Sequence, residues 1–136
     1  MKENLIHYRT CVCNINYHMV WSVKYRRKIL SAEVEAYLQE LVQEIAEDKG
    51  FTVHLFECEE GDHVHCFVSA PPKLSITAIM KYLKGISGRK LFERFPEIRN
   101  QLWKGELWNH SYYVEMVGSV SEENIRRYIE HQSKAY

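Results

Sequence analysis

The sequence predicts an α+β fold, in which an antiparallel sheet carries two helices on one face and a further helix follows the last strand. Three observations support this prediction. Segments rich in β-branched and aromatic residues are typical of strands. Two long stretches place apolar residues every three or four positions, as amphipathic helices do. Short turn-like segments join consecutive elements, and 136 residues suit one domain, 1–136.

The first half of the chain predicts a strand, a helix and a strand hairpin. Residues 13–24 are rich in β-branched and aromatic side chains and are expected to form the first strand. A helix is expected between Ser31, a candidate N-cap, and Gly50, a candidate stop, because apolar residues recur there at helical spacing. Two strands joined by a turn come next: 51–58, the turn 59–62, and 63–69.

The second half predicts a helix, a strand and a terminal helix. Apolar residues recur at helical spacing over 76–95, and Pro96 is expected to end that helix. Residues 112–117 are the fourth strand, and a last helix covers roughly 121–133. The resulting order, βαββαβ plus a C-terminal helix, is the ferredoxin-like plan. It leaves the outer face of the central strands to a ligand or to the last helix.

The formal net charge is zero, but the charges are segregated along the chain. Residues 31–62 hold ten acidic side chains and one basic, whereas residues 71–104 hold eight basic and two acidic. Such segregation permits a nucleic-acid partner, although taken alone it is more often explained by ordinary solvated faces. The candidate phosphate-binding residues are Lys73, Lys81, Lys84, Arg89 and Lys90, with Arg26 and Arg27 as weaker candidates.

Composition is that of an ordinary globular protein, with 46% apolar and 26% charged residues. No stretch approaches 18 consecutive apolar residues and no apolar signal core follows Met1, so we expect a cytoplasmic protein with no membrane span. The four cysteines lack the spacing of a zinc ribbon and are expected to be free thiols.

The segment His63-Val64-His65 carries the clearest chemical signal. Strand side chains alternate between faces, so both imidazoles point to one face and Val64 points to the other. Two imidazoles can bind a divalent metal but need a third ligand. Asp62 could orient an imidazole, contribute an oxygen or simply serve the turn. Without further partners, such a pair is more often two histidines that merely hydrogen-bond on a half-buried strand.

Tyr128 and Gln132 lie four residues apart on one face of the predicted last helix. If Gln132 donated its oxygen to a metal at the histidines, the phenol would lie near that metal. A phenol has a pKa of about 10, so it needs a nearby cation to act as a nucleophile at neutral pH. These elements together suggest attack of the Tyr128 hydroxyl on a metal-polarised phosphodiester. The resulting phosphotyrosine conserves the bond energy for later rejoining.

The chain resembles the HUH single-tyrosine transposase family, the TnpA-like enzymes of insertion sequences that move as single-stranded DNA. The resemblance covers roughly residues 14–133. The motifs that carry it are 17–28, 62–65 and 128–132, with further similarity over 80–85 and 108–118. Cys66 differs, because such sequences often have leucine there, but its side chain points away from the histidine face.

The resemblance implies a role for each of these residues. His63 and His65 resemble two metal ligands, Gln132 the third, and Tyr128, on the C-terminal helix, the nucleophile. It implies cleavage and rejoining of single-stranded DNA at hairpin-marked element ends, through a 5′-phosphotyrosine with a free 3′-hydroxyl. It also implies Mg²⁺ or Mn²⁺, and a homodimer in which the helix bearing Tyr128 can serve the histidines of either subunit.

Three alternatives remain open at this point. A domesticated relative that cuts genomic palindromes would have the same active-site residues. A non-catalytic nucleic-acid-binding module of ferredoxin-like fold would need exposed aromatic side chains on the central strands, with Phe56 and Phe67 as candidates. A small metal-dependent hydrolase that uses activated water would have no need of Tyr128.

Overall fold

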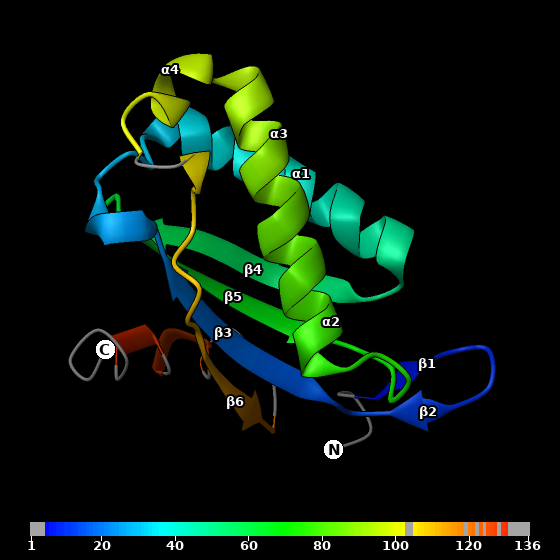
Figure 1. Cartoon of the computed structure of the whole chain (residues 1–136). Helices are drawn as coiled ribbons and strands as arrows, with labels where there is room; N and C mark the ends of the chain where they lie inside the picture. The colour runs from blue at the N-terminus through cyan, green and yellow to red at the C-terminus, as the bar shows by residue number, and fades with distance from the viewer. Residues whose placement is uncertain are drawn as a thin grey trace.

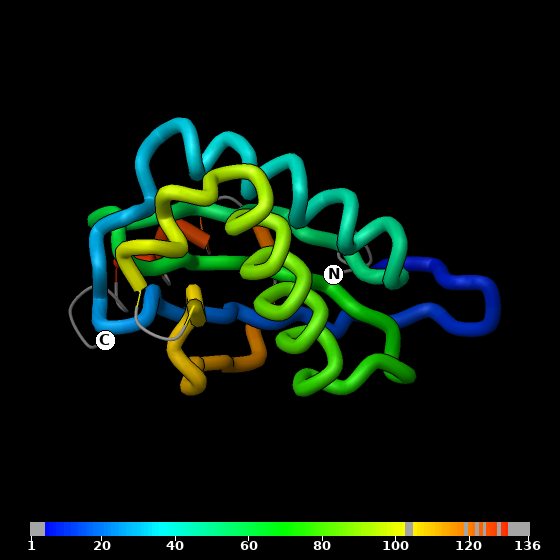
Figure 2. Tube along the Cα trace, turned by 45° about the horizontal axis from the view of Figure 1, so that its top comes forward, coloured from blue at the N-terminus to red at the C-terminus, as the bar shows by residue number. Residues whose placement is uncertain are grey.

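The structure, a computed structural model, describes residues 5–102, 105–118, 120, 121, 123, 125–127, 129 and 130. It has an antiparallel sheet of four strands with one layer of helices across one face (Figure 1). The view in Figure 2 shows α1 and the helical run after β5 side by side in that layer. The α+β fold predicted from the sequence is therefore confirmed.

The main sheet has the strand order β4-β5-β3-β6, and every neighbouring pair is antiparallel. Its strands are β3 (Asn16–Ser22), β4 (Thr52–Glu59), β5 (His63–Ser69) and β6 (Tyr113–Val117). This is the ferredoxin-like arrangement, with the first and third strands of the βαββαβ unit at the centre. The predicted strand 63–69 has the observed bounds, and the others agree to within a few residues.

Helix α1 (Ala32–Lys49) begins and ends where the sequence predicts. The hydroxyl oxygen of Ser31 accepts a hydrogen bond from the backbone N–H of Val34 at 3.3 Å, which caps the first turn. Gly50 ends the helix with φ of 86°, a left-handed conformation that glycine adopts without steric cost.

The helical run predicted over 76–95 consists of three pieces. They are α2 (Ile76–Lys81), a π-helical segment (Tyr82–Ile86) and α3 (Ser87–Arg94). Pro96 does not only end this run, because it also begins the short helix α4 (Pro96–Arg99). Proline suits the first helical position, where its missing N–H would have had no intrahelical partner.

The N-terminal region differs from the predicted strand 13–24. Strands β1 (Ile6–His7) and β2 (Val12–Cys13) form a separate two-stranded sheet, and the central strand begins only at Asn16. The strand ends before Lys24 because Tyr25 and Arg26 adopt φ of 62° and 54°, which no strand can accommodate.

The two faces of the sheet bury different residues. Toward the helices lie Met19 and Trp21 of β3 with Val64 and Cys66 of β5, all fully buried in the main core. On the opposite face a smaller cluster joins Phe67 to Val117 and Ile125, with Val120 and Ile129 packed against it. The C-terminal segment therefore covers the face that carries the histidines. No helix in the described part of the chain is long and apolar enough to cross a membrane.

Candidate active site

The β4–β5 hairpin brings two histidines and a carboxylate together. Its register places Glu59 directly opposite His63. The oxygen Oε2 of Glu59 lies 3.4 Å from Nε2 of His63 and 2.7 Å from Nε2 of His65. The two imidazoles thus point to one face, as strand alternation predicts, and their Nε2 atoms converge on one point.

Each histidine uses its other ring nitrogen to contact a buried partner. Nδ1 of His63 lies 2.8 Å from Oδ1 of Asp62, whose second oxygen accepts a hydrogen bond from Nε of Arg26 at 3.4 Å. Nδ1 of His65 lies 3.0 Å from Nε2 of His18, on the neighbouring strand β3. Of the roles left open for Asp62, the structure supports the one that orients an imidazole.

Burial keeps these groups in the protonation states that ligation needs. Desolvation lowers the pKa of His65, and desolvation together with the neighbouring His65 lowers the pKa of His18 to about 4. Burial alone would raise the pKa of Asp62, but the hydrogen bond from His63 and the charge of Arg26 lower it on balance. The imidazoles of His18 and His65 are therefore neutral at neutral pH, and the carboxyl group of Asp62 is ionised.

The residues at this point fit a divalent cation. One donor atom from each of Glu59, His63 and His65 lies within 4.8 Å of the others. Nε2 of His65 is buried and lies 2.7 Å from the carboxylate oxygen of Glu59, so both atoms point to the position that a cation would occupy. Two imidazole nitrogens and a carboxylate oxygen form a mixed donor set that suits Mg²⁺, Mn²⁺ or Zn²⁺.

The remaining two predicted site residues, Tyr128 and Gln132, lie outside the described residues. Described residues near them in sequence do contact the histidine face. Ile125 is buried against Phe67 of β5, and Ile129 packs against the same cluster. Since Phe67 is fully buried and Phe56 belongs to the main core, neither is an exposed stacking platform of the kind that a non-catalytic binding module needs.

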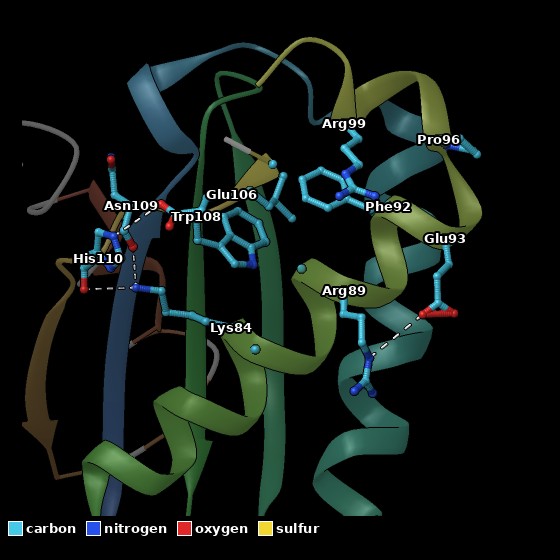
Figure 3. A pocket seen from close by; sticks show the side chains of 14 residues that line it. Lys84, Arg89, Phe92, Glu93, Pro96, Arg99, Glu106, Trp108, Asn109 and His110 are labelled. Atoms are coloured by element: carbon cyan, nitrogen blue, oxygen red, sulfur yellow. Dashed lines mark hydrogen bonds and ion pairs between the residues drawn. The ribbon is translucent and has the colours of Figure 1, made fainter. Parts of the chain in front are cut away.

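Most of the predicted DNA-binding residues have exposed side chains. These are Arg27, Lys73, Lys81, Arg89 and Lys90. Arg26, although exposed, also contacts Asp62. Lys84 is half-buried, and its ammonium donates hydrogen bonds to the backbone carbonyls of Asn109 and His110 (Figure 3). It donates a further hydrogen bond to the carbonyl of Ser111. The contacts of Lys84 hold a loop in place.

Lys84 and Arg89 also line an open cavity of about 760 Å³ between α3 and the loop after α4 (Figure 3). Trp108 forms part of its wall and donates a hydrogen bond from Nε1 to Ser87 at 2.9 Å. The cavity lies on the helix side of the sheet, whereas the histidines lie on the other side. It is therefore separate from the histidine site.

Three residues of the histidine site were not predicted from the sequence: Glu59, His18 and Glu115. Glu59 falls in the predicted turn 59–62, but β4 extends one residue further and pairs Glu59 with His63. His18 and Glu115 come together only through strand pairing between segments almost one hundred residues apart. No local pattern indicates such a register.

Comparison with known proteins identifies the family. A family model described as IS200-like transposase matches residues 11–132. The ISDra2 transposase TnpA of Deinococcus radiodurans is 39% identical over 124 residues, which cover 91% of this chain and 88% of that protein. The transposase of insertion sequence IS200 from Salmonella typhimurium is 34% identical over 119 residues, covering 88% and 77% respectively.

Solved structures agree with this assignment. A crystal structure of a putative transposase from Deinococcus radiodurans superposes with a TM-score of 0.75 and 35% identity, covering 93% of this chain and 97% of that one. A REP-associated tyrosine transposase bound to a REP hairpin superposes with a TM-score of 0.58 over 91% of this chain and 67% of that one. At 12% identity, the second match shows a shared fold alone. By sequence and by fold, this chain belongs to the IS200-like family of HUH single-tyrosine transposases.

Proposed function

We propose that this transposase cleaves and rejoins single-stranded DNA through a covalent bond between Tyr128 and a 5′-phosphate. The observation that carries the proposal is the convergence of His63, His65 and Glu59 on the sheet face that the C-terminal segment covers. Burying two imidazoles costs desolvation free energy, which a cation bound by their converging Nε2 atoms would offset. The family supports a DNA strand as the substrate.

The proposed reaction is a substitution at phosphorus. The hydroxyl oxygen of Tyr128 attacks the scissile phosphate, the bond from phosphorus to the 3′ oxygen breaks, and a free 3′-hydroxyl leaves. The strand is then joined to the enzyme by a 5′-phosphotyrosine. Attack of another 3′-hydroxyl on that bond reverses the step and rejoins DNA without ATP.

His63, His65 and Gln132 are the proposed ligands of one Mg²⁺ or Mn²⁺ ion, and Glu59 is a further candidate ligand. A bound cation supplies positive charge to a non-bridging phosphate oxygen and to the phenolate. The protein contributes neutral imidazoles held in place by Asp62 and His18, so that their Nε2 atoms already point to one position.

The proposed substrate is a DNA hairpin at the end of an insertion sequence. The fold is shared with a tyrosine transposase whose structure contains a REP hairpin. The exposed basic residues Arg27, Lys73, Lys81, Arg89 and Lys90 are proposed to contact phosphates. A domesticated palindrome-cutting relative remains the alternative, since its chemistry would be the same.

We also propose a homodimer. Strands β4 and β6 are the edges of the sheet in the described part of the chain, and exposed edges pair readily with a second copy. Pairing about a twofold axis would bring two histidine sites near each other. Light scattering at micromolar concentration with hairpin DNA is expected to give the mass of a dimer, and a monomer would contradict this proposal.

The central test is a denaturing gel that detects protein joined covalently to labelled single-stranded DNA. The wild-type chain with Mg²⁺ is expected to form the adduct, and Tyr128→Phe is expected to form none while still binding the hairpin. Tyr112→Phe is the matched control, because Tyr112 is an exposed tyrosine that lies over the Lys84 ammonium rather than the histidines. An adduct that persists in Tyr128→Phe would overturn the mechanism.

Two further arms of this experiment separate the alternatives. His63→Ala is expected to abolish the adduct. Cleavage of the DNA by the wild type without any adduct would instead favour a hydrolase. Mixing Tyr128→Phe subunits with His63→Ala subunits tests for shared sites. Recovery of adduct in the mixture is expected if the tyrosine of one subunit serves the histidines of the other, and a mixture that stays inactive would show sites made within one chain.

A further inference from the structure

A row of three polar side chains crosses the sheet beneath the C-terminal segment. Glu115 of β6 pairs directly with His18 of β3, and His18 lies diagonal to His65 of β5. Nε2 of His18 is 3.0 Å from Nδ1 of His65, and Nδ1 of His18 is 3.7 Å from Oε1 of Glu115. His18 and His65 are at most 1% exposed, so solvent does not substitute for these contacts.

The contact between the two rings fixes their tautomers jointly. A neutral imidazole has one N–H donor and one acceptor nitrogen. If His65 keeps its proton on Nδ1, it donates to His18, and its Nε2 lone pair and the Glu59 oxygen 2.7 Å away both face the position of a cation. If His18 donates instead, the proton of His65 lies on Nε2, where it can bond to Glu59 but blocks ligation. The tautomer of His18 therefore decides whether His65 can act as a ligand.

Glu115 favours the tautomer that permits ligation. With its proton on Nδ1, His18 presents a positive N–H dipole to the Glu115 carboxylate and a lone pair to His65. The separation of 3.7 Å is that of an electrostatic contact rather than a hydrogen bond. In the opposite tautomer, a lone pair on Nδ1 would face the carboxylate, which is unfavourable in a buried site.

Packing holds the His18 ring in the orientation that this contact requires. The ring stacks on Phe67 with a centroid distance of 4.3 Å and an interplanar angle of 7°. It also lies edge-on to Tyr113 at 6.5 Å. The stack fixes the plane of the His18 ring, and the 3.0 Å contact of its Nε2 with His65 selects one of the two flips that share this plane.

We propose that His18, oriented by Glu115, is a positioning residue that holds His65 in the tautomer able to bind the catalytic cation. The inference rests on the proposed function, since it requires a cation at Nε2 of His65. It adds to that function a role for His18 of β3 and Glu115 of β6, which orient the metal ligand His65. His63 receives the corresponding support directly from Asp62.

The test is the affinity of metal-stripped full-length protein for Mn²⁺, measured by calorimetry without DNA. His18→Phe keeps a flat ring on Phe67 but offers no acceptor to His65, and is expected to bind Mn²⁺ about 10- to 100-fold more weakly. His18→Gln places an amide oxygen near the former Nε2 position, and is expected to stay within about threefold of wild type. Glu115→Gln is expected to weaken binding by about threefold.

Control variants separate this role from folding and from the proposed function. His54→Phe, which removes an exposed histidine of β4 bonded to Ser69, is expected to leave Mn²⁺ affinity unchanged. Thermal unfolding with chelator reports whether each variant folds. If His18→Phe does not fold, the Mn²⁺ affinity of Glu115→Gln relative to wild type still tests the proposal. His65→Ala is expected to lose Mn²⁺ binding.

Two results would overturn the inference alone: wild-type affinity in a folded His18→Phe while His65→Ala loses binding, or equal losses in His18→Phe and His18→Gln. If His18→Phe does not fold, wild-type affinity in Glu115→Gln overturns it. Absence of Mn²⁺ binding by the wild type would instead remove the metal site of the proposed function, and this inference with it.

Discussion

The two faces of the β3–β5 strand pair are equally buried but chemically opposite. Met19, Trp21 and Val64 on the helix side are fully buried, and His18 and His65 on the other side are at most 1% exposed. The helix face is held by apolar packing, whereas every histidine of the other face has a polar partner. One pair of neighbouring strands can therefore serve as core on one side and as reactive site on the other, because strand residues alternate.

This division predicts that substitutions on the helix face destabilise the fold without a direct effect on metal binding. The largest effect is expected for Trp21→Ala, which empties the space between Trp108 and Phe56. It is expected to lower the free energy of unfolding by about 3–5 kcal/mol, measured by urea denaturation with chelator.

Trp21→Phe sharpens that prediction. Nε1 of Trp21 is buried and has no hydrogen-bond partner in the described part of the chain, so phenylalanine removes an unsatisfied donor as well as some volume. We expect a loss of less than about 2 kcal/mol. A loss as large as that of Trp21→Ala would show that the indole makes a contact beyond packing.

On the histidine face, the next largest effect is expected for the partner of His63. Asp62→Ala removes the oxygen that holds Nδ1 of His63 and is expected to weaken Mn²⁺ binding about 10- to 100-fold. Asp62→Asn retains an acceptor and should weaken binding less. Calorimetry on metal-stripped protein measures both, and unchanged affinity in Asp62→Ala would argue against a histidine ligand at position 63.

Lys84 and Arg89 offer a smaller, matched comparison on the helix side. Lys84 hydrogen-bonds three loop carbonyls, so Lys84→Met is expected to cost about 1–2 kcal/mol of unfolding free energy. Arg89 is exposed, and its Nε lies 4.0 Å from a carboxylate oxygen of Glu93. Arg89→Gln should leave stability unchanged and reduce the slope of log affinity against log salt by about one unit.

Hairpin binding measured at several salt concentrations checks both expectations. A slope that changes for Lys84→Met and not for Arg89→Gln would reverse the assignment of structural and DNA-binding roles.

The sequence was informative wherever a local pattern determines the structure. Ser31 and Gly50 delimit α1 because capping depends on neighbouring residues, and His63 and His65 share a face because strand periodicity is local. The partners His18 and Glu115 were missed because register between distant strands depends on the whole sheet. Tyr128 was predicted from resemblance and helical spacing, and its position lies outside the described residues.

The most direct test of the two-face account compares Val64→Ala with His63→Asn. The two residues are adjacent in β5 and point to opposite faces. Asparagine retains a donor close to the Nδ1 position, so the contact with Asp62 can persist while the Nε2 ligand is lost. Each variant is measured for unfolding free energy with chelator and for Mn²⁺ affinity.

Val64→Ala and His63→Asn are expected to have opposite effects on stability and on Mn²⁺ affinity. Val64→Ala should lose about 2 kcal/mol of unfolding free energy and keep its Mn²⁺ affinity within about twofold. His63→Asn should keep its free energy of unfolding within about 1 kcal/mol of wild type. It should lose Mn²⁺ affinity by more than about 100-fold, because the substitution removes a metal ligand, whereas Asp62→Ala removes only a residue that orients one. Retention of Mn²⁺ affinity in His63→Asn, or losses of affinity that simply follow stability in both variants, would contradict the two-face account.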